Sequence, residues 1–385
     1  MLMIGKNSSQ EISLYFHIPF CTRKCSYCHF YVLPDKENSK IELLTAFKQE
    51  WEQWLPFLQN KTISTVYFGG GTPFLFGPER IASVLEFIKK DVTFASNRTE
   101  ITLEANPENI TLPIMKEYRD AGINRVSIGI QTLDDNLLKI LGRLHQAKTA
   151  SDAVIQTAEA GISNISVDLM YDLPMQTIEH WDHTLKQVRE LPITHLSLYN
   201  LTIEPHTVFF KKQEILKKQL PDEETSLAMY ERAIELLEEQ GLKQYEISAF
   251  AKTGFHSRHN VGYWTARPFL GFGPSAFSYW EGKRFRNIAN LKKYCYDLNN
   301  GLSPIDFEEK LDPQAHLREL LVIELRLREG VNLEEFQIRH GTIDTQTLDL
   351  LKALKQQNYV NIDDFIVKLS KRGILFYDSV ASELI

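Results

Sequence analysis

The sequence has few cysteines, no long apolar run and no excess of positive charge, and each absence excludes a class of protein. Four cysteines among 385 residues are too few for a small secreted domain held together by disulfides. No stretch approaches the apolar length needed to cross a bilayer, and residues 1–10 lack the basic start and apolar core of a signal peptide. We therefore expect a cytoplasmic protein.

Positive charge is scarce as well, because 43 Lys and Arg stand against 50 Asp and Glu, for a net charge of −7. Nucleic-acid backbones are bound by clustered Lys and Arg, so this balance argues against a nucleic-acid-binding protein. Contact with a membrane surface remains open. The chain is long enough for one large domain and one small domain.

The cysteines that are present are concentrated, since Cys21, Cys25 and Cys28 lie within eight residues. Thiolates at this density in a chain without secretory features favour a metal or cluster over disulfides. Zinc sites usually use four protein ligands, and no second cysteine pair follows. A [4Fe–4S] cluster fits three thiolates better, because one iron then stays open to a small molecule. A reduced cysteine cluster and a zinc knuckle remain alternatives.

The Cys-x3-Cys-x2-Cys spacing, with Tyr27 before the third cysteine, resembles the signature of the radical S-adenosylmethionine (SAM) superfamily. This resemblance implies that the amino and carboxylate groups of SAM bind the open iron. The leading Tyr15-Phe-His-Ile-Pro-Phe-Cys21 is similar to the branch of oxygen-independent coproporphyrinogen dehydrogenases and their HemW-type heme-chaperone relatives. Phe30 stands where the dehydrogenases carry a further cysteine, as it does in the chaperone subgroup.

Short β-rich runs alternate with amphipathic stretches, which predicts repeated βα units around a parallel sheet. Glycines 122, 161 and 241 are expected to end helices just before strands. Six such units are too few for an eightfold barrel, and the resemblance implies a partial (β/α)6 TIM-like barrel. The predicted strands are 12–18, 65–68, 100–105, 125–130, 164–169 and 195–201, with a short run at 244–247. The predicted helices are 40–57, 79–90, 111–121, 134–141, 149–160, 178–190 and 222–240.

Polar residues follow several of these strands, at the edge where α/β folds bind their ligands. The glycines of Gly69-Gly70-Gly71-Thr72-Pro73 would let backbone N–H groups approach a ligand, although a tight turn is an alternative. Strand-end carboxylates can also simply cap the next helix. By resemblance, the SAM-binding residues are Tyr15, Tyr27, Gly70, Gly71, Thr72, Glu104, Gln131, Arg143 and Asp168. For Arg143, an exposed helix position is the alternative.

The segment from His259 to Trp264 is rich in aromatic and metal-ligating side chains. Imidazole is a ligand for haem iron, and Tyr263 and Trp264 offer flat apolar surface, so the segment is expected to bind heme or another porphyrin. Its His-Asn-x-x-Tyr-Trp pattern resembles a motif of HemW-type chaperones. The alternative is a structural loop that packs on the barrel. His17 is expected to hydrogen-bond locally, and Cys295 to be a helical core thiol.

We predict three domains: the barrel over 1–245, an extension over 246–310, and a mainly α, winged-helix-like domain over 311–385. The last carries 9 Lys and Arg against 12 Asp and Glu, which disfavours DNA binding and favours a substrate lid or partner surface.

Three functions follow from this pattern. The favoured one is a heme chaperone that carries a [4Fe–4S] cluster and SAM and passes heme to heme-requiring proteins, including proteins at the membrane. The alternatives are an oxygen-independent coproporphyrinogen III dehydrogenase, against which the missing fourth cysteine argues, and a cluster-free binding protein. No catalytic residue is assigned, and the oligomeric state is left open.

Overall fold

The computed structural model describes residues 11–95 and 99–385. Residues 1–10, over which the sequence predicts no signal peptide, lie outside the described part of the chain. Six parallel strands form the inner wall of a partial barrel, in the spatial order β9-β8-β7-β6-β4-β1. They are β1 (Glu11–Ile18), β4 (Thr62–Gly70), β6 (Glu100–Ala105), β7 (Arg125–Gln131), β8 (Asn164–Tyr171) and β9 (His195–Asn200). All six predicted strands are present.

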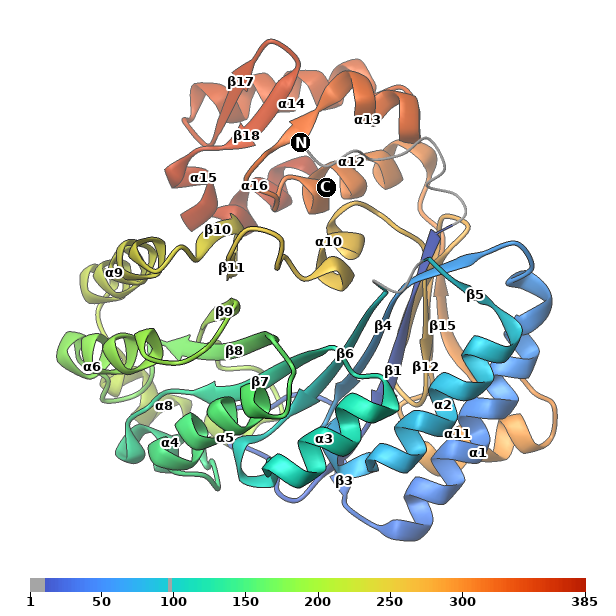
Figure 1. Ribbon diagram of the computed structural model, residues 1–385. Helices are drawn as coiled ribbons and strands as arrows, with labels where there is room; N and C mark the ends of the chain where they lie inside the picture. Colours follow the sequence, from blue (N-terminus) through green and yellow to red (C-terminus); the bar gives the residue numbers. More distant parts are fainter. Residues whose placement is uncertain (1–10, 96–98) are drawn as a thin grey trace.

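Helices cover the outer face of this wall, as Figure 1 shows for α1, α2 and α3. Their apolar faces pack on the strands in one large core. Gly122 adopts a left-handed conformation with φ +114° and ends α3, as the sequence predicts. The helices are α1 (Glu37–Trp54), α2 (Pro78–Asp91), α3 (Leu112–Ala121), α4 (Asp135–Leu141), α5 (Ala147–Glu159), α6 (Ile178–Arg189), α7 (Val208–Lys211), α8 (Gln213–Leu216) and α9 (Glu223–Glu239).

The sheet continues beyond the six strands at both edges. On one side β12 (Phe269–Phe272) pairs parallel to β1, and β13 (Phe277–Trp280), β14 (Lys283–Asn287) and β15 (Ile305–Glu309) follow antiparallel. On the other side β11 (Ala249–Ala251) pairs antiparallel with β9, and β10 (Lys243–Glu246) pairs antiparallel with β11. The sequence analysis missed β12–β15, because runs of four or five residues interrupted by turns carry little periodicity.

Two further helices belong to this region, α10 (Arg258–Trp264) and α11 (Leu291–Asn299). Cys295 lies on α11 and is buried against α1, so the prediction of a helical core thiol is confirmed. No helix in the described ranges is long and apolar enough to cross a membrane.

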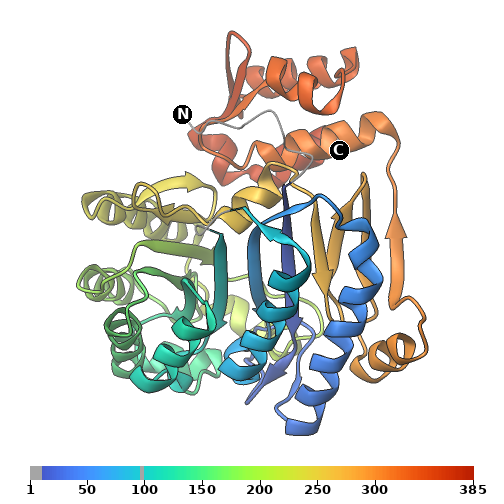
Figure 2. The ribbon, with the colours of Figure 1, turned by 45° about the vertical axis from the view of Figure 1, so that its right-hand side comes forward.

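The C-terminal part packs on one end of the barrel, and Figure 2 shows that β15 leads directly into it. It has its own apolar core. A three-stranded antiparallel sheet in the order β16-β18-β17 packs with its helices, as a winged-helix-like domain requires. Its elements are α12 (Pro313–Glu324), β16 (Val331–Asn332), α13 (Leu333–His340), α14 (Thr345–Gln356), β17 (Val360–Asp363), β18 (Ile366–Leu369), α15 (Lys371–Leu375) and α16 (Tyr377–Leu384).

Candidate functional site: a cysteine loop and an adjoining aromatic cavity

The loop that carries the three cysteines is closed at its base by a short parallel ladder between β2 (Phe20–Cys21) and β3 (Leu33–Pro34). The end of β4 packs directly against this base, where the Gly71 N–H donates to the Ile18 carbonyl at 2.9 Å. A Cβ atom at Gly71 would lie 2.8 Å from the Phe20 carbonyl oxygen, so only glycine permits the approach. The loop is therefore positioned by backbone contacts with β1 and β4.

A continuous chain of hydrogen bonds, here called the polar ring, links two of the thiols. Cys21 Sγ lies 3.5 Å from Thr72 Oγ1, which accepts a hydrogen bond from Asn106 Nδ2 at 3.0 Å. Arg143 donates to Asn106 Oδ1 at 2.8 Å and to Cys25 Sγ at 3.4 Å. Such bonds orient sulfur ligands and tune the electron density on them. The polar ring thus gives the cysteines the surroundings of metal ligands.

The three thiols are free and half-buried, and their spacing fits a cluster better than a single ion. Among the described residues, no three His, Cys, Asp or Glu side chains are close enough to hold one metal ion. In a [4Fe–4S] cluster each thiolate binds a different iron, so the sulfurs need not converge on one point. Burial raises the pKa of Cys21 to about 11 and also raises that of Cys28, so these thiols would need a metal to lose their protons.

The glycine run packs more tightly than the sequence interpretation assumed. The N–H of Gly70 donates to Glu104 Oε2 at 3.1 Å, and that of Thr72 donates to the Phe20 carbonyl at 2.8 Å. The idea that these N–H groups are free for a ligand is therefore corrected: they hold the cysteine loop and Glu104 in place. The Tyr67 hydroxyl donates to the other oxygen of Glu104 at 2.8 Å, and burial raises the pKa of Glu104 to about 7.

Arg143 follows the end of α4 and is largely buried, which excludes an exposed helix position. Besides its bonds in the polar ring it donates to the Gly129 carbonyl at 2.6 Å, while its Nε is buried without a partner among the described residues. Burial opposes the charge, but Tyr27 and Cys25 raise the pKa of Arg143 overall. A buried unpaired donor is costly, and an anionic group such as the SAM carboxylate would satisfy it.

Gln131 ends β7 with a positive φ of 64°, which a non-glycine residue adopts only at a cost. Its side chain is turned back over Gly129, where a Cβ atom would lie 2.9 Å from the Gln131 amide nitrogen and 3.5 Å from the Arg143 guanidinium. The bend therefore brings Gln131 beside Arg143.

Asp168 on β8 accepts a hydrogen bond from Ser127 of β7 at 3.3 Å, and burial raises its pKa. Its charge also contributes to the raised pKa of Glu104, so the two carboxyls share the barrel interior. SAM carries an ammonium and a ribose diol, which carboxylates can bind. The structure thus brings the predicted strand-end residues together.

Tyr15 and His17 connect this site to the cysteine loop. The Tyr15 hydroxyl lies 3.0 Å from His17 Nδ1, and His17 Nε2 donates to the Tyr31 carbonyl at 3.2 Å. Because a carbonyl only accepts, Nε2 carries the proton and Nδ1 accepts from Tyr15. Burial lowers the pKa of His17 to about 4, so the ring is neutral at pH 7. The expected local role of His17 is confirmed. Tyr27 packs near Phe209 of α7.

The segment with His259 forms α10, whose first N–H groups are capped by the Glu100 carboxylate at 3.0 Å. His259 is 1% exposed, and both ring nitrogens are occupied, one by Thr65 Oγ1 at 2.8 Å and the other by the Tyr263 hydroxyl at 2.7 Å. Iron could bind this imidazole only after one of these bonds broke. In this structure His259 supports Tyr263 from behind.

Tyr263 and Trp264 instead face a cavity of about 570 Å³, which lies beside β1 and contains Tyr15 and His17 in its wall. The cysteine loop forms another wall through three consecutive residues, and α12 of the C-terminal domain closes a third side. These contributions are His29, Phe30 and Tyr31 from the loop, Phe269, Phe277 and Tyr279 from the extended sheet, and Glu319, Leu320 and Ile323 from α12.

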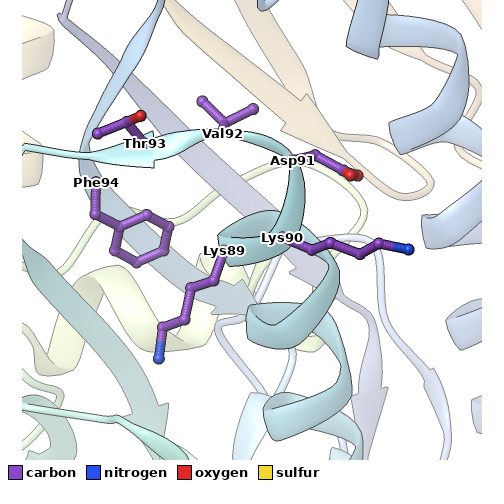
Figure 3. Close-up of a pocket in the computed structure, with 6 residues that line it drawn as sticks. All are labelled: Lys89, Lys90, Asp91, Val92, Thr93 and Phe94. Atoms are coloured by element: carbon purple, nitrogen blue, oxygen red, sulfur yellow. The ribbon is translucent and has the colours of Figure 1, made fainter.

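A second hollow, shown in Figure 3, has a different character. It is lined by one continuous stretch, residues 89–94, at the end of α2 and the start of β5 (Thr93–Phe94). Lys89 and Lys90 extend from it in different directions, and the Asp91 carboxylate accepts from the Trp51 indole at 2.8 Å. None of its lining residues belongs to the polar ring or the cavity, and it brings no reactive groups together.

Sequence reasoning missed Asn106 of the polar ring and the cavity walls from β13 and α12. Asn106 had a signal, because it is polar and directly follows β6, the strand that carries Glu104. The cavity walls had none, since Phe277 and Leu320 read as ordinary apolar residues of a strand and a helix.

Family models and individual relatives both relate this chain to radical SAM proteins. The model of the radical SAM superfamily matches residues 15–188, and that of the HemN C-terminal domain matches residues 311–376. The chain is 32% identical to the heme chaperone HemW of Bacillus subtilis, covering 96% of this chain and 97% of that protein. It is 35% identical to the heme chaperone HemW of Haemophilus influenzae, covering 96% of each.

Among solved structures, the coproporphyrinogen III oxidase HemN from Escherichia coli superposes with a TM-score of 0.85 at 22% identity, covering 97% of this chain and 90% of that chain. This likeness confirms the predicted fold, a partial α/β barrel with a small C-terminal domain. At this identity it carries no information on the reaction.

Proposed function

Because the chain belongs to the HemW family of radical SAM proteins, we propose that it is a heme chaperone, which binds heme and transfers it to heme-dependent proteins. The similarity covers nearly the whole chain, and Phe30 occupies the position at which the dehydrogenases carry a further cysteine. We place the protein in the cytoplasm, where its thiols stay reduced, with acceptors that include proteins at the membrane.

The observation that carries this proposal is the aromatic cavity directly beside the cysteine loop. Phe30 and Phe277 expose 54% and 49% of their surface, although both line the cavity. Exposed apolar surface of this kind marks a place where a ligand or partner binds. The volume lies within the range of about 300–1,000 Å³ that is typical of small-molecule sites. A planar porphyrin would cover these rings.

The residues present also suit the two cofactors of the family. Cys21, Cys25 and Cys28 would hold a [4Fe–4S] cluster, and Arg143, Glu104, Gln131 and Asp168 would hold SAM, together with Tyr15, Tyr27, Gly70, Gly71 and Thr72. The cluster supplies, when bound, an iron that is open to SAM. The protein itself orients the thiols through the polar ring and keeps the arginine beside them charged.

The test separates the chaperone from the dehydrogenase. Anaerobically reconstituted protein is incubated with heme, and separately with coproporphyrinogen, SAM and a reductant. We expect stoichiometric heme binding and heme transfer to an apo-acceptor, without formation of protoporphyrinogen. Efficient turnover of coproporphyrinogen would contradict the proposal.

A further inference from the structure

Two arginines reach the cavity, and their electrostatic surroundings differ. Arg284 of β14 forms ion pairs with Glu309 and Glu319, so its charge is neutralised within the protein. Arg267, which follows α10 and lines the cavity, forms no ion pair within 4.0 Å among the described residues, and the carboxylates of Glu11 and Glu100 act on its charge only from a longer distance. Its Nη1 only donates to the Ser13 hydroxyl at 3.4 Å and to the Arg258 carbonyl at 3.3 Å. The cavity therefore contains a cation whose charge is not balanced by an ion pair.

The position of Arg267 is built into the fold. Its backbone N–H donates to the Gly262 carbonyl at 2.8 Å, and a Cβ atom at Gly262 would lie 2.9 Å from Arg267 Nη1. Glycine at this place on α10 thus makes room for the guanidinium. The side chain is half-buried, and burial lowers the pKa of Arg267 because it penalises the charged form. An anionic oxygen entering the cavity would offset that penalty.

The surroundings define the kind of anion. Tyr263 and Phe269, whose ring centroids are 4.6 Å apart, line the same cavity as Arg267, and Phe277 and Leu320 add further apolar surface to its wall. A small inorganic anion would leave this surface uncovered. A flat apolar ligand that carries a carboxylate at its edge would cover the rings and meet the guanidinium, which binds carboxylates with two parallel hydrogen bonds.

We propose that Arg267 binds a carboxylate of a tetrapyrrole lying in the cavity, and that it selects cargo with a free carboxylate. This inference rests on the proposed heme-chaperone function and adds a specificity-determining residue to it. Arg143 is the cation of the polar ring. The proposal therefore assigns one arginine, Arg143, to the cofactor and another, Arg267, to the cargo.

The experiment compares iron protoporphyrin IX with its dimethyl ester, in which both carboxylates are neutral. Binding of each is titrated into the wild-type protein, Arg267→Gln, Arg267→Lys and the control Arg232→Gln. Arg232 lies on α9 away from the residues that line the cavity, paired with Asp182 at 3.2 Å. We expect the wild type to prefer the free acid by about tenfold or more, Arg267→Gln to lose that preference, and Arg232→Gln to keep it. Arg267→Lys should retain part of it.

The outcomes separate the two proposals. Failure of the wild type to bind either compound would overturn the heme-chaperone function itself. Binding of acid and ester with equal affinity by the wild type would overturn only the role of Arg267, as would an undiminished preference in Arg267→Gln. The wild-type comparison decides the matter even if Arg267→Gln does not fold, and circular dichroism identifies that case.

Discussion

The polar ring and the cavity lie side by side, share the cysteine loop, and are built in opposite ways. In the polar ring, Thr72 and Asn106 come after β4 and β6, Arg143 comes after α4, and hydrogen bonds link them to the cysteines. In the cavity, aromatic rings come from β1, the loop, α10, the extended sheet and α12, and several remain exposed. In the polar ring, Arg143 Nε is buried without a partner among the described residues, whereas the cavity has exposed apolar surface and an arginine without an ion pair.

The largest effect is expected from a substitution that removes a thiol of the polar ring and leaves the residues of the cavity unchanged. Cys25→Ala removes one of three thiolates and should abolish most cluster iron and the visible charge-transfer absorption, because a cube cannot be held stably by two ligands. Heme binding should persist, since the cavity walls are unchanged. Iron content and heme titration measure the two effects, with Cys295→Ser as the matched control. Wild-type iron in Cys25→Ala would contradict the assignment.

A pH titration tests the charge of Glu104. Its pKa of about 7 means that the carboxyl is largely protonated at pH 5 and must lose that proton to pair with the SAM ammonium. SAM affinity should therefore rise with pH between 5 and 7, by up to about tenfold per pH unit, and level off above. Glu104→Gln should bind more weakly at pH 8 and show a flat profile. Calorimetry at several pH values provides the measurement, and an unchanged slope in the variant would place the titrating group elsewhere.

Asp168→Ala should weaken SAM binding by about tenfold, the loss expected when a hydrogen bond worth about 1.4 kcal/mol disappears from a closed site. Iron content should stay at the wild-type level, because Asp168 does not contact the cysteines in the polar ring. Equilibrium binding to reconstituted protein measures the effect. Full SAM affinity in the variant would exclude Asp168 from the pocket.

The smallest effect on heme affinity is expected from substitutions at Tyr263 and His259, beside the cavity. Tyr263→Phe keeps the aromatic wall and removes the hydroxyl that occupies His259, so heme affinity should fall by less than about threefold if His259 only supports Tyr263. His259→Ala should have a similarly small effect and leave the Soret band in place. A shifted Soret band in His259→Ala alone would instead identify this imidazole as an iron ligand, which requires the structure to rearrange.

The two regions also differ in how far the sequence could predict them. Cys21 could be singled out from the spacing of the three cysteines, and Glu104, Gln131 and Asp168 could be expected to lie together because strand order along the chain places the strand ends at one edge of a parallel sheet. The place of Arg267 and Phe277 in one cavity could not be predicted, because it depends on the antiparallel strands after β12. The short runs of these strands carry no clear period. His259 was read from its chemistry as a ligand, yet its hydrogen bonds to Thr65 and Tyr263 depend on tertiary contacts that the chain order does not reveal.

The contribution of α12 to the cavity has a consequence for how the protein is made. Domains fold as units during synthesis, the N-terminal one first. The cysteine loop and the six parallel strands are complete once the ribosome has passed β9, whereas Glu319, Leu320 and Ile323 belong to the last part translated. All residues of the polar ring are thus translated before α12, and the proposed cargo site is completed only when the C-terminal domain has been made.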